Sequence, residues 1–183
     1  MPSFHRDAMT KILIVYSTTD GHTLAICRVL GQVIERLGHV VTLSDIGDAD
    51  QLDLAGFDKV VIGASIRYGR HRRQVFDFIG RHQALLDARP NAFFSVNIVA
   101  RKPDKNRPET NPYLRQFLRR IAWHPRRLAV FAGKLDYPHY RFIDRLMIRF
   151  IMLLTHGPTD PRTVVEFTDW PAVEAFGHTL AEM

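Results

Sequence analysis

Cysteine is almost absent from this chain, because Cys27 is the only one among 183 residues. A single cysteine excludes an intramolecular disulfide framework and a metal site built on cysteines. The nine histidines show neither a His-x-x-x-His nor a His-x-x-Glu-His spacing, so we predict no metal site. We therefore expect a reducing, cytosolic environment, in which Cys27 is a small core residue.

Long apolar runs are also lacking, because no segment reaches the roughly 20 apolar residues that a membrane-spanning helix needs. We expect a chain that does not cross a bilayer. Acidic residues are outnumbered, with 19 Asp and Glu against 25 Lys and Arg, and the formal charge is +6. This charge predicts an anionic partner: a lipid headgroup, nucleic acid or a small molecule with carboxylates. No nucleic-acid-binding module is recognisable and the aromatic residues lie mainly in core periods, so we expect no nucleic acid.

What the sequence does contain is a strand-to-helix turn at residues 17–23, Ser-Thr-Thr-Asp-Gly-His-Thr. Before it, residues 12–16 are apolar and mostly β-branched, which predicts a parallel strand buried on both faces. After it, apolar residues recur every three or four positions up to Leu37, which predicts a helix that Gly38 ends. Hydroxyls and backbone N–H groups at a helix N-terminus favour an anion.

Two nucleotide-binding signatures are missing from this turn. It has no lysine and no Gly-x-x-x-x-Gly-Lys-Ser/Thr spacing, and there is no Gly-x-Gly-x-x-Gly fingerprint. We therefore predict that the turn binds a monophosphate through backbone amides and the hydroxyls of Thr18, Thr19 and Thr23, without a counter-cation. The alternative is an ordinary Ser/Thr/Asp cap on the helix.

Further strands are predicted at residues 39–43, 59–66, 92–100 and 128–133, with helices at 75–86 and 113–121 between them. This alternation predicts an α/β fold, a doubly wound five-stranded parallel sheet with helices on both faces. Ligands of such sheets bind at the carboxyl ends of the strands, so the loops that start at Ser17, Ala64 and Asn97 are expected to surround one crevice. The second of these loops carries an aromatic residue and four arginines: Tyr68, Arg67, Arg70, Arg72 and Arg73.

Residues 142–155 predict an amphipathic helix. Its apolar arc holds Phe142, Ile143, Leu146, Met147, Phe150, Ile151, Leu153 and Leu154; its polar arc holds Arg141, Asp144, Arg145, Arg149, Thr155 and His156, interrupted by Ile148 and Met152. Flanked by Tyr137 and Tyr140, the helix fits a membrane interface. The alternative is a core helix that packs its apolar face on the sheet.

The end of the chain returns to the sheet. A short strand is predicted at residues 163–167, followed by a helix that Asp169 caps and that has Pro171 in its first turn. Residues 136–162 are therefore predicted to be an insertion in the region of the fifth strand. The domain is expected to span residues 10–183, after a disordered extension or tag at residues 1–9.

The motif Thr-x-Asp-Gly-x-Thr at residues 18–23 resembles the phosphate loop of the flavodoxins, Ser/Thr-x-Thr-Gly-x-Thr. Asp20 departs from that pattern and adds a negative charge, which makes hydrogen bonding by the hydroxyls and amides more necessary. Further motifs extend the resemblance over residues 10–182: Gly-Ala-Ser-Ile-Arg-Tyr-Gly at 63–69, Ser-Val-Asn-Ile-Val-Ala-Arg-Lys-Pro at 95–103, Tyr-Pro-x-Tyr-Arg at 137–141 and Thr-Asp-Trp at 168–170. Together they resemble the family of menaquinone-dependent protoporphyrinogen IX dehydrogenases.

The resemblance implies an FMN enzyme of haem biosynthesis that oxidises protoporphyrinogen IX in two-electron steps and passes the electrons to a membrane quinone, menaquinone or ubiquinone. Because the flavin carries the redox chemistry, no separate catalytic residue is expected. The phosphate is placed at residues 18–23 and the flavin ring between loops 64–69 and 97–101, with Tyr68 stacking on it. The predicted cofactor-binding residues are Ser17, Thr18, Thr19, Asp20, Gly21, His22, Thr23, Ala64, Ser65, Ile66, Arg67, Tyr68, Gly69, Asn97, Ile98, Val99, Ala100 and Arg101.

Both partners of the reaction have expected binding regions. The two propionates of the substrate are assigned to the arginines, with Arg67 and Arg70 foremost and Arg72 and Arg73 beside them. Residues 139–156 are predicted to dock on the cytoplasmic face of the inner membrane as a peripheral contact, where quinone is dissolved. The predicted membrane-facing residues are Phe142, Leu146, Met147, Phe150, Ile151 and Leu154.

Other functions on the same fold stay open. A soluble flavodoxin-type electron carrier or an NAD(P)H:quinone reductase would share the FMN site. A phosphoacceptor receiver domain would share the sheet and a lysine at the position of Lys134, but it needs an aspartate where Ser65 stands and an acidic pair where Asp20 stands alone. A homo-oligomer is also left open.

Overall fold

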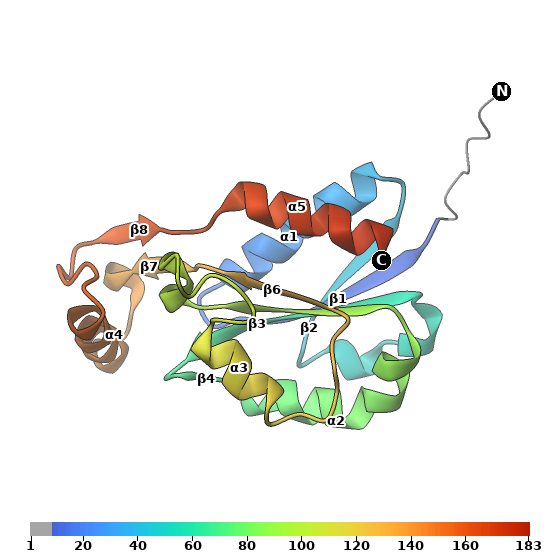
Figure 1. Cartoon of the computed structure of the whole chain (residues 1–183), viewed down its shortest axis with the longest axis horizontal. Helices are drawn as coiled ribbons and strands as arrows, with labels where there is room; N and C mark the ends of the chain where they lie inside the picture. Colours follow the sequence, from blue (N-terminus) through green and yellow to red (C-terminus); the bar gives the residue numbers. More distant parts are fainter. Residues whose placement is uncertain (1–8) are drawn as a thin grey trace.

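The computed structural model describes residues 9–183, so residues 1–8 of the extension predicted at residues 1–9 lie outside this range. Its centre is a parallel sheet with the strand order β2-β1-β3-β5-β6 (Figure 1). The strands are β1 (Lys11–Ser17), β2 (Val40–Asp45), β3 (Lys59–Arg67), β5 (Asn91–Val96) and β6 (Arg127–Phe131). The two-residue strand β4 (Arg70–His71) pairs antiparallel with the end of β3. The predicted doubly wound parallel sheet is confirmed.

Helices cover both faces of this sheet (Figure 1). Helices α1 (His22–Arg36) and α5 (Trp170–Glu182) lie on one face, and α2 (Arg73–Ala88) and α3 (Pro112–Leu118) lie on the other. Side chains alternate along a strand, so Ile12 and Ile14 of β1 pack towards α1 and α5, whereas Leu13 and Val15 pack towards α2 and α3. Four short 3₁₀ turns complete the described part of the chain: η1 (Ala49–Gln51), η2 (Leu54–Gly56), η3 (Ile98–Arg101) and η4 (Tyr137–His139).

Helix ends follow the sequence signals. Gly38 adopts a left-handed conformation with φ of +90° directly after α1, as expected for a glycine that ends a helix. Asp169 caps α5 by accepting a hydrogen bond of 3.0 Å from the Ala172 N–H, and Pro171 lies in the first turn. Both predictions are confirmed.

The predicted strand at residues 92–100 is too long. Strand β5 ends at Val96, because the Asn97 side chain accepts a hydrogen bond of 3.1 Å from the Ala100 N–H and turns the chain into η3. Val99 and Ala100 are consequently buried. The predicted fifth strand also ends early, at Phe131, and the helix predicted through residue 121 ends at Leu118.

Beyond β6 the chain leaves the layered body. Strand β7 (Lys134–Asp136) pairs antiparallel with β8 (Val164–Glu166) in a separate two-stranded sheet. The short strand predicted at residues 163–167 therefore has a partner that the sequence did not indicate. Between β7 and β8 lie η4 and helix α4 (Phe142–Leu154), which sits beyond the carboxyl edge of the main sheet (Figure 1).

Helix α4 turns its apolar arc outward. In α4, all of which the structure describes, the buried residues are Asp144 and Met152. Seven apolar side chains are exposed: Phe142, Ile143, Leu146, Met147, Phe150, Leu153 and Leu154. The alternative of a core helix packed on the sheet by this face is therefore wrong. The flanking tyrosines were also misplaced, because Tyr137 and Tyr140 are buried in a small cluster with Leu135 and Met152. Among the described residues, no helix combines the length and apolarity needed to span a bilayer.

Candidate functional site

The turn after β1 has the geometry of an anion cradle. Gly21, with φ of +81°, occupies the N-cap position of α1 in a left-handed conformation, and α1 has no side-chain cap. The Thr18 hydroxyl instead accepts a hydrogen bond of 3.0 Å from the Gly21 N–H, which tightens the turn. The alternative of an ordinary Ser/Thr/Asp cap is therefore wrong, and the first N–H groups of α1 keep their capacity to bind an anion.

Two hydroxyls at the ends of this turn have no partner. Among the described residues, the Ser17 and Thr23 hydroxyls are buried side-chain oxygens without a hydrogen bond. Buried polar groups are nearly always hydrogen-bonded, and leaving one unpaired costs roughly 1–3 kcal/mol. A phosphate bound in the turn would give the Thr23 hydroxyl an acceptor, so the residues present fit a phosphate group.

Two arginines, Arg67 at the end of β3 and Arg72 before α2, contact the turn. Arg72 donates a hydrogen bond of 3.1 Å to the Thr19 hydroxyl, and Arg67 forms a 3.4 Å ion pair with Asp20. The sequence prediction of a site without a counter-cation is thus corrected. These arginines are separated from the turn by 47 and 53 positions in the sequence. No local spacing therefore indicates that they contact it.

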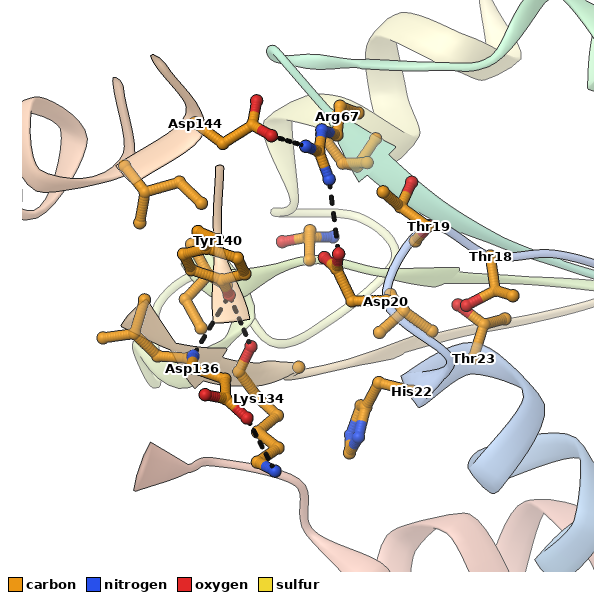
Figure 2. Close-up of a pocket in the computed structure, with 18 of the residues that line it drawn as sticks. Thr18, Thr19, Asp20, His22, Thr23, Arg67, Lys134, Asp136, Tyr140 and Asp144 are labelled. Carbon is orange, nitrogen blue, oxygen red and sulfur yellow. Dashed lines mark hydrogen bonds and ion pairs between the residues drawn. The ribbon is translucent and has the colours of Figure 1, made fainter. Parts of the chain in front are cut away.

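The three predicted loops do meet, around a cavity of about 660 Å³ (Figure 2). Most predicted cofactor-binding residues line it: Thr18, Thr19, Asp20, Gly21, His22, Thr23, Ser65, Ile66, Arg67, Tyr68, Gly69, Asn97 and Ile98. The others do not: Ser17 and Ala64 are buried at strand ends, Val99 and Ala100 are buried in η3, and Arg101 donates to the Thr155 carbonyl and hydroxyl after α4 at 3.1 and 2.8 Å.

The segment after β6 supplies a further part of the cavity wall. The sequence did not indicate which of its residues line the cavity. Met147, Ile148 and Ile151 of α4 line the cavity, so Ile151 faces inward and not towards a membrane as predicted. Asp136 lies here, 3.1 Å from Lys134 (Figure 2) and 2.6 Å from His139. The hydrogen bond from His139, with that from Lys134, lowers the pKa of the Asp136 carboxyl despite opposing desolvation.

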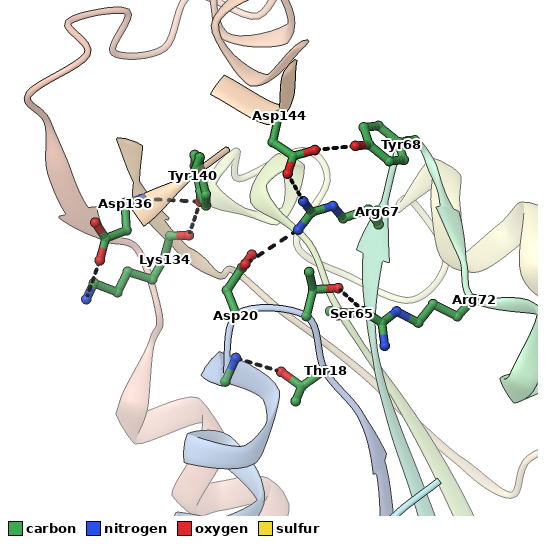
Figure 3. Close-up of polar contacts among 12 residues, drawn as sticks. Thr18, Asp20, Ser65, Arg67, Tyr68, Arg72, Lys134, Asp136, Tyr140 and Asp144 are labelled. Atoms are coloured by element: carbon green, nitrogen blue, oxygen red, sulfur yellow. Dashed lines mark hydrogen bonds and ion pairs between the residues drawn. The ribbon is translucent and has the colours of Figure 1, made fainter. Parts of the chain in front are cut away.

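An ionic network crosses the mouth of the cavity. The buried carboxylate of Asp144 in α4 accepts hydrogen bonds from the Arg67 guanidinium and the Tyr68 hydroxyl, and Arg67 also contacts Asp20 (Figure 3). Burial acts to lower the pKa of Arg67, but the Tyr68 hydrogen bond and the charges of Asp20 and Asp144 raise it above its ordinary value. Arg67 is therefore engaged by protein carboxylates, although the sequence assigned it to cofactor and substrate.

Tyr68 is held in an unusual backbone conformation. Its φ is +50° and that of Gly69 is +77°, and the two residues form the turn that joins β3 to β4. Left-handed conformations at both positions are typical of two-residue hairpins, but they are rare for a tyrosine and concentrate at functional sites. The Tyr68 side chain is 54% exposed and lines the cavity, which suits an aromatic residue that covers a ligand.

His22 connects the turn to the start of α5. Its Nε2 lies 2.6 Å from the Thr168 hydroxyl, which donates its own proton to the Ala132 carbonyl at 2.9 Å. Since that hydroxyl has one proton, we assign the His22 Nε2–H as the donor in this pair. Burial lowers the pKa of His22, which favours the neutral ring, and in this tautomer Nδ1 is an acceptor.

A second cavity, also of about 660 Å³, adjoins the first. The two share Asp20, Arg67, Tyr68, Tyr140 and Asp144 among their lining residues. The second is strongly basic, because its wall contains Arg67, Arg70, Arg72, Arg73 and Arg141. Arg141, which precedes α4, lines the same cavity as the four arginines that the sequence places in one loop. This arrangement suits a ligand with several carboxylates next to a phosphate-bearing one.

Comparison with known proteins agrees with this geometry. A family model described as a flavodoxin domain matches residues 13–162. Flavodoxin 1 from Bacillus cereus has a solved structure with the same fold, at a TM-score of 0.54 and 14% identity, covering 94% of this chain and 98% of that one. Fold and family model together define a flavodoxin-like protein.

Two curated relatives narrow the family. One, from Escherichia coli strain K12, is 43% identical over 173 residues, which is 94% of this chain and 96% of the relative. Another, from Leishmania major, is 44% identical over 174 residues, which is 94% of this chain and 75% of the relative. Both are named protoporphyrinogen IX dehydrogenase (quinone). The chain belongs to this family of flavodoxin-like oxidoreductases, as its motifs predicted.

Proposed function

We propose that this chain binds FMN and oxidises protoporphyrinogen IX to protoporphyrin IX in haem biosynthesis, with a membrane quinone as the electron acceptor. One observation carries the cofactor assignment: the Thr23 hydroxyl, buried without a partner, lines the cavity next to a left-handed glycine turn at an uncapped helix N-terminus. Thr18 to Thr23 would hold the phosphate through hydroxyls and amides, with Arg72 as a nearby cation.

The chain's own residues would mainly position the partners. Bound FMN would supply the two-electron redox chemistry, so no dedicated acid or base is required. Tyr68 and the loop around Asn97 provide two parts of the cavity wall. The apolar residues Met147, Ile148 and Ile151 exclude water from the side of α4.

The substrate carboxylates would bind in the basic cavity. A porphyrinogen with two propionates needs two cationic groups at the edge of the flavin site, and arginine matches a carboxylate with paired donors. Arg70, Arg72, Arg73 and Arg141 line this cavity, and the names of the relatives support this substrate. Arg67 was also assigned to the substrate from the sequence, but two of its five N–H donors already bond to Asp20 and Asp144.

The outward face of α4 would dock on the cytoplasmic face of the inner membrane. Its seven exposed apolar side chains form one stripe, and the exposed Arg141 and Arg149 lie beside it. An apolar stripe with flanking arginines is typical of a helix that lies in an anionic lipid interface. Met147 at the border of the stripe lines the cavity together with Ile148 and Ile151, so docking would bring bilayer quinone close to the flavin.

The cofactor is tested by the absorption spectrum of the purified protein. We expect a yellow flavin band, and release of FMN on denaturation. A protein that is colourless, and stays so after incubation with excess FMN and gel filtration, would contradict the cofactor assignment.

The reaction is tested by anaerobic mixing of the FMN-loaded protein with protoporphyrinogen IX. We expect flavin bleaching and porphyrin fluorescence, and reoxidation of the flavin on addition of a menaquinone or ubiquinone analogue. Bleaching by NADPH, with none by the porphyrinogen, would instead identify an NAD(P)H:quinone reductase.

A further inference from the structure

Helix α4 is fastened to the cavity loops at two points, and both use an arginine of a predicted flavin loop. Near its start, Asp144 accepts hydrogen bonds from Arg67 and Tyr68 of the β3–β4 hairpin. At its end, Arg101 of η3 donates to the Thr155 carbonyl and hydroxyl. A cation at the carbonyl end of a helix is favourable because it meets the negative end of the helix dipole.

The apolar contacts of this helix are confined to one small cluster. The buried residues of α4, which the structure describes in full, are Asp144 and Met152, and Met152 belongs to a cluster with Leu135, Tyr137 and Tyr140, against which Ile98, Ile148 and Phe167 pack. Arg145 adds hydrogen bonds to the Tyr137 and Tyr140 carbonyls at 3.2 and 3.3 Å. The polar tie at Asp144 is therefore a large part of what orients α4.

The same tie reaches the phosphate turn. Arg67 contacts Asp144 on one side and Asp20 on the other, so a single guanidinium joins α4 to the turn at residues 18–23. Next to Asp144, the side chains of Ile148 and Ile151 form a wall of the cavity, Met147 lies at the border between this wall and the exposed apolar stripe, and the other six residues of the stripe do not line the cavity. Whatever fills the cavity contacts the inner side of the helix whose outer side meets the membrane.

We infer that Asp144 is a positioning residue that couples the two faces of α4: through Arg67 and Tyr68 it links occupancy of the flavin cavity to docking of the helix on anionic lipid. This inference rests on the proposed function. Because linkage is reciprocal, FMN increases affinity for the membrane by the same factor by which the membrane increases affinity for FMN. Arg67 then serves this tie, and the substrate carboxylates go to the arginines of the second cavity.

The test measures the factor by which FMN and the membrane each raise the affinity for the other. FMN is titrated by fluorescence quenching into the full-length apoprotein, with and without vesicles of phosphatidylglycerol and phosphatidylethanolamine, and vesicle flotation is measured with and without FMN. For the parent chain we expect both affinities to rise by the same factor, about fivefold or more. Equal affinities with and without the other ligand would overturn the inference.

Asp144→Asn keeps the shape of the side chain and removes its charge. We expect this variant to bind FMN and vesicles, each separately, while the factor falls to about one. Asp104→Asn changes the net charge equally at an exposed position outside both cavities, and its factor is expected to match that of the parent. Tyr68→Phe removes one of the two hydrogen bonds to Asp144 and keeps the ring, so an intermediate factor is expected.

The outcomes separate this inference from the proposed function. An unchanged factor in both Asp144→Asn and Tyr68→Phe overturns the role of Asp144 and leaves FMN binding intact. A parent chain that binds no FMN contradicts the proposed function itself. A parent chain that binds FMN but not vesicles overturns the coupling together with membrane docking.

Discussion

Helices α1 and α4 are both amphipathic, yet they face the protein with opposite sides. Helix α1 turns its apolar side to the sheet and buries Ile26, Leu30, Val33 and Ile34. Helix α4 turns its polar side to the protein and buries Asp144, while seven apolar side chains stay exposed. An exposed apolar patch of this kind marks an interaction surface.

The comparison teaches that a helical wheel finds two faces but does not say which one is buried. For α1, the flanking strands β1 and β2 leave one place for the helix, against the sheet. For α4, the decision is made by contacts distant in sequence, at Arg67 and Arg101.

The largest expected effect concerns His71, which is buried in the layered body against Phe93 and Phe117, with Nε2 3.1 Å from the Ser95 hydroxyl. Burial lowers its pKa from 6.5 to about 3. Between these values the unfolded chain binds more protons than the folded one, so stability is fully present above pH 6.5 and is lost as pH falls towards 3. The total is on the order of 4–5 kcal/mol, at about 1.4 kcal/mol per pKa unit.

Urea unfolding at several pH values checks this prediction. We expect the difference in unfolding free energy between the parent and His71→Gln to shrink or reverse as the pH is lowered, because glutamine does not titrate. Parallel pH profiles for the parent and His71→Gln would contradict the buried, neutral histidine.

The next largest effect compares one leucine from each helix. Leu30 of α1 is fully buried and Leu146 of α4 is 59% exposed. Leu30→Ala is expected to lower the free energy of unfolding by about 3 kcal/mol, because it removes buried methyl groups and leaves a cavity. Leu146→Ala is expected to change it by less than about 0.5 kcal/mol. Equal losses in urea unfolding would mean that α4 buries its apolar side as α1 does.

Much of the body was predictable because its signals are local. The apolar β-branched run at residues 12–16 could only be a strand buried on both faces, and Asp169 with Pro171 marks a helix start. The rule that ligands bind at the carboxyl ends of parallel strands brought three loops together correctly. The family motifs then indicated the class of reaction, that of an oxidoreductase.

What escaped prediction depends on contacts between distant residues. The tie from Asp144 to Arg67 spans 77 positions and the bond from Arg72 to Thr19 spans 53. Tyr137 and Tyr140 have interfacial chemistry, but their hydroxyls bond to the Pro158 and Lys134 carbonyls and their rings are buried. Val99 and Ala100 continue the apolar run of the strand, so the sequence predicted them in it. The strand ends earlier because the Asn97 side chain accepts a hydrogen bond from the Ala100 N–H, and a hydrogen bond of this kind leaves no periodic pattern in the sequence.

A smaller effect is expected at the phosphate turn. Thr23→Val removes a buried hydroxyl that has no partner, so the apoprotein should be as stable as the parent or more stable by up to about 1 kcal/mol. FMN affinity should fall by about tenfold or more, because a hydrogen bond to a charged group contributes roughly 1.5–3 kcal/mol. Fluorescence titration measures this loss.

Thr179→Val serves as the control, because Thr179 bonds only within α5, to the Ala175 carbonyl, and lines neither cavity. Its FMN affinity is expected to equal that of the parent. An unchanged affinity in Thr23→Val would place the phosphate elsewhere.

The central claim is that the outward face of α4 is a membrane surface, and vesicle flotation of Phe150→Asp tests it most directly. Leu37→Asp is the matched control, since Leu37 is an exposed apolar residue at the end of α1 and the charge change is identical. We predict that Phe150→Asp binds anionic vesicles about tenfold more weakly than the parent, because an apolar contact is lost and a like charge is added, while Leu37→Asp binds as the parent does. Equal flotation of Phe150→Asp and Leu37→Asp would contradict the account.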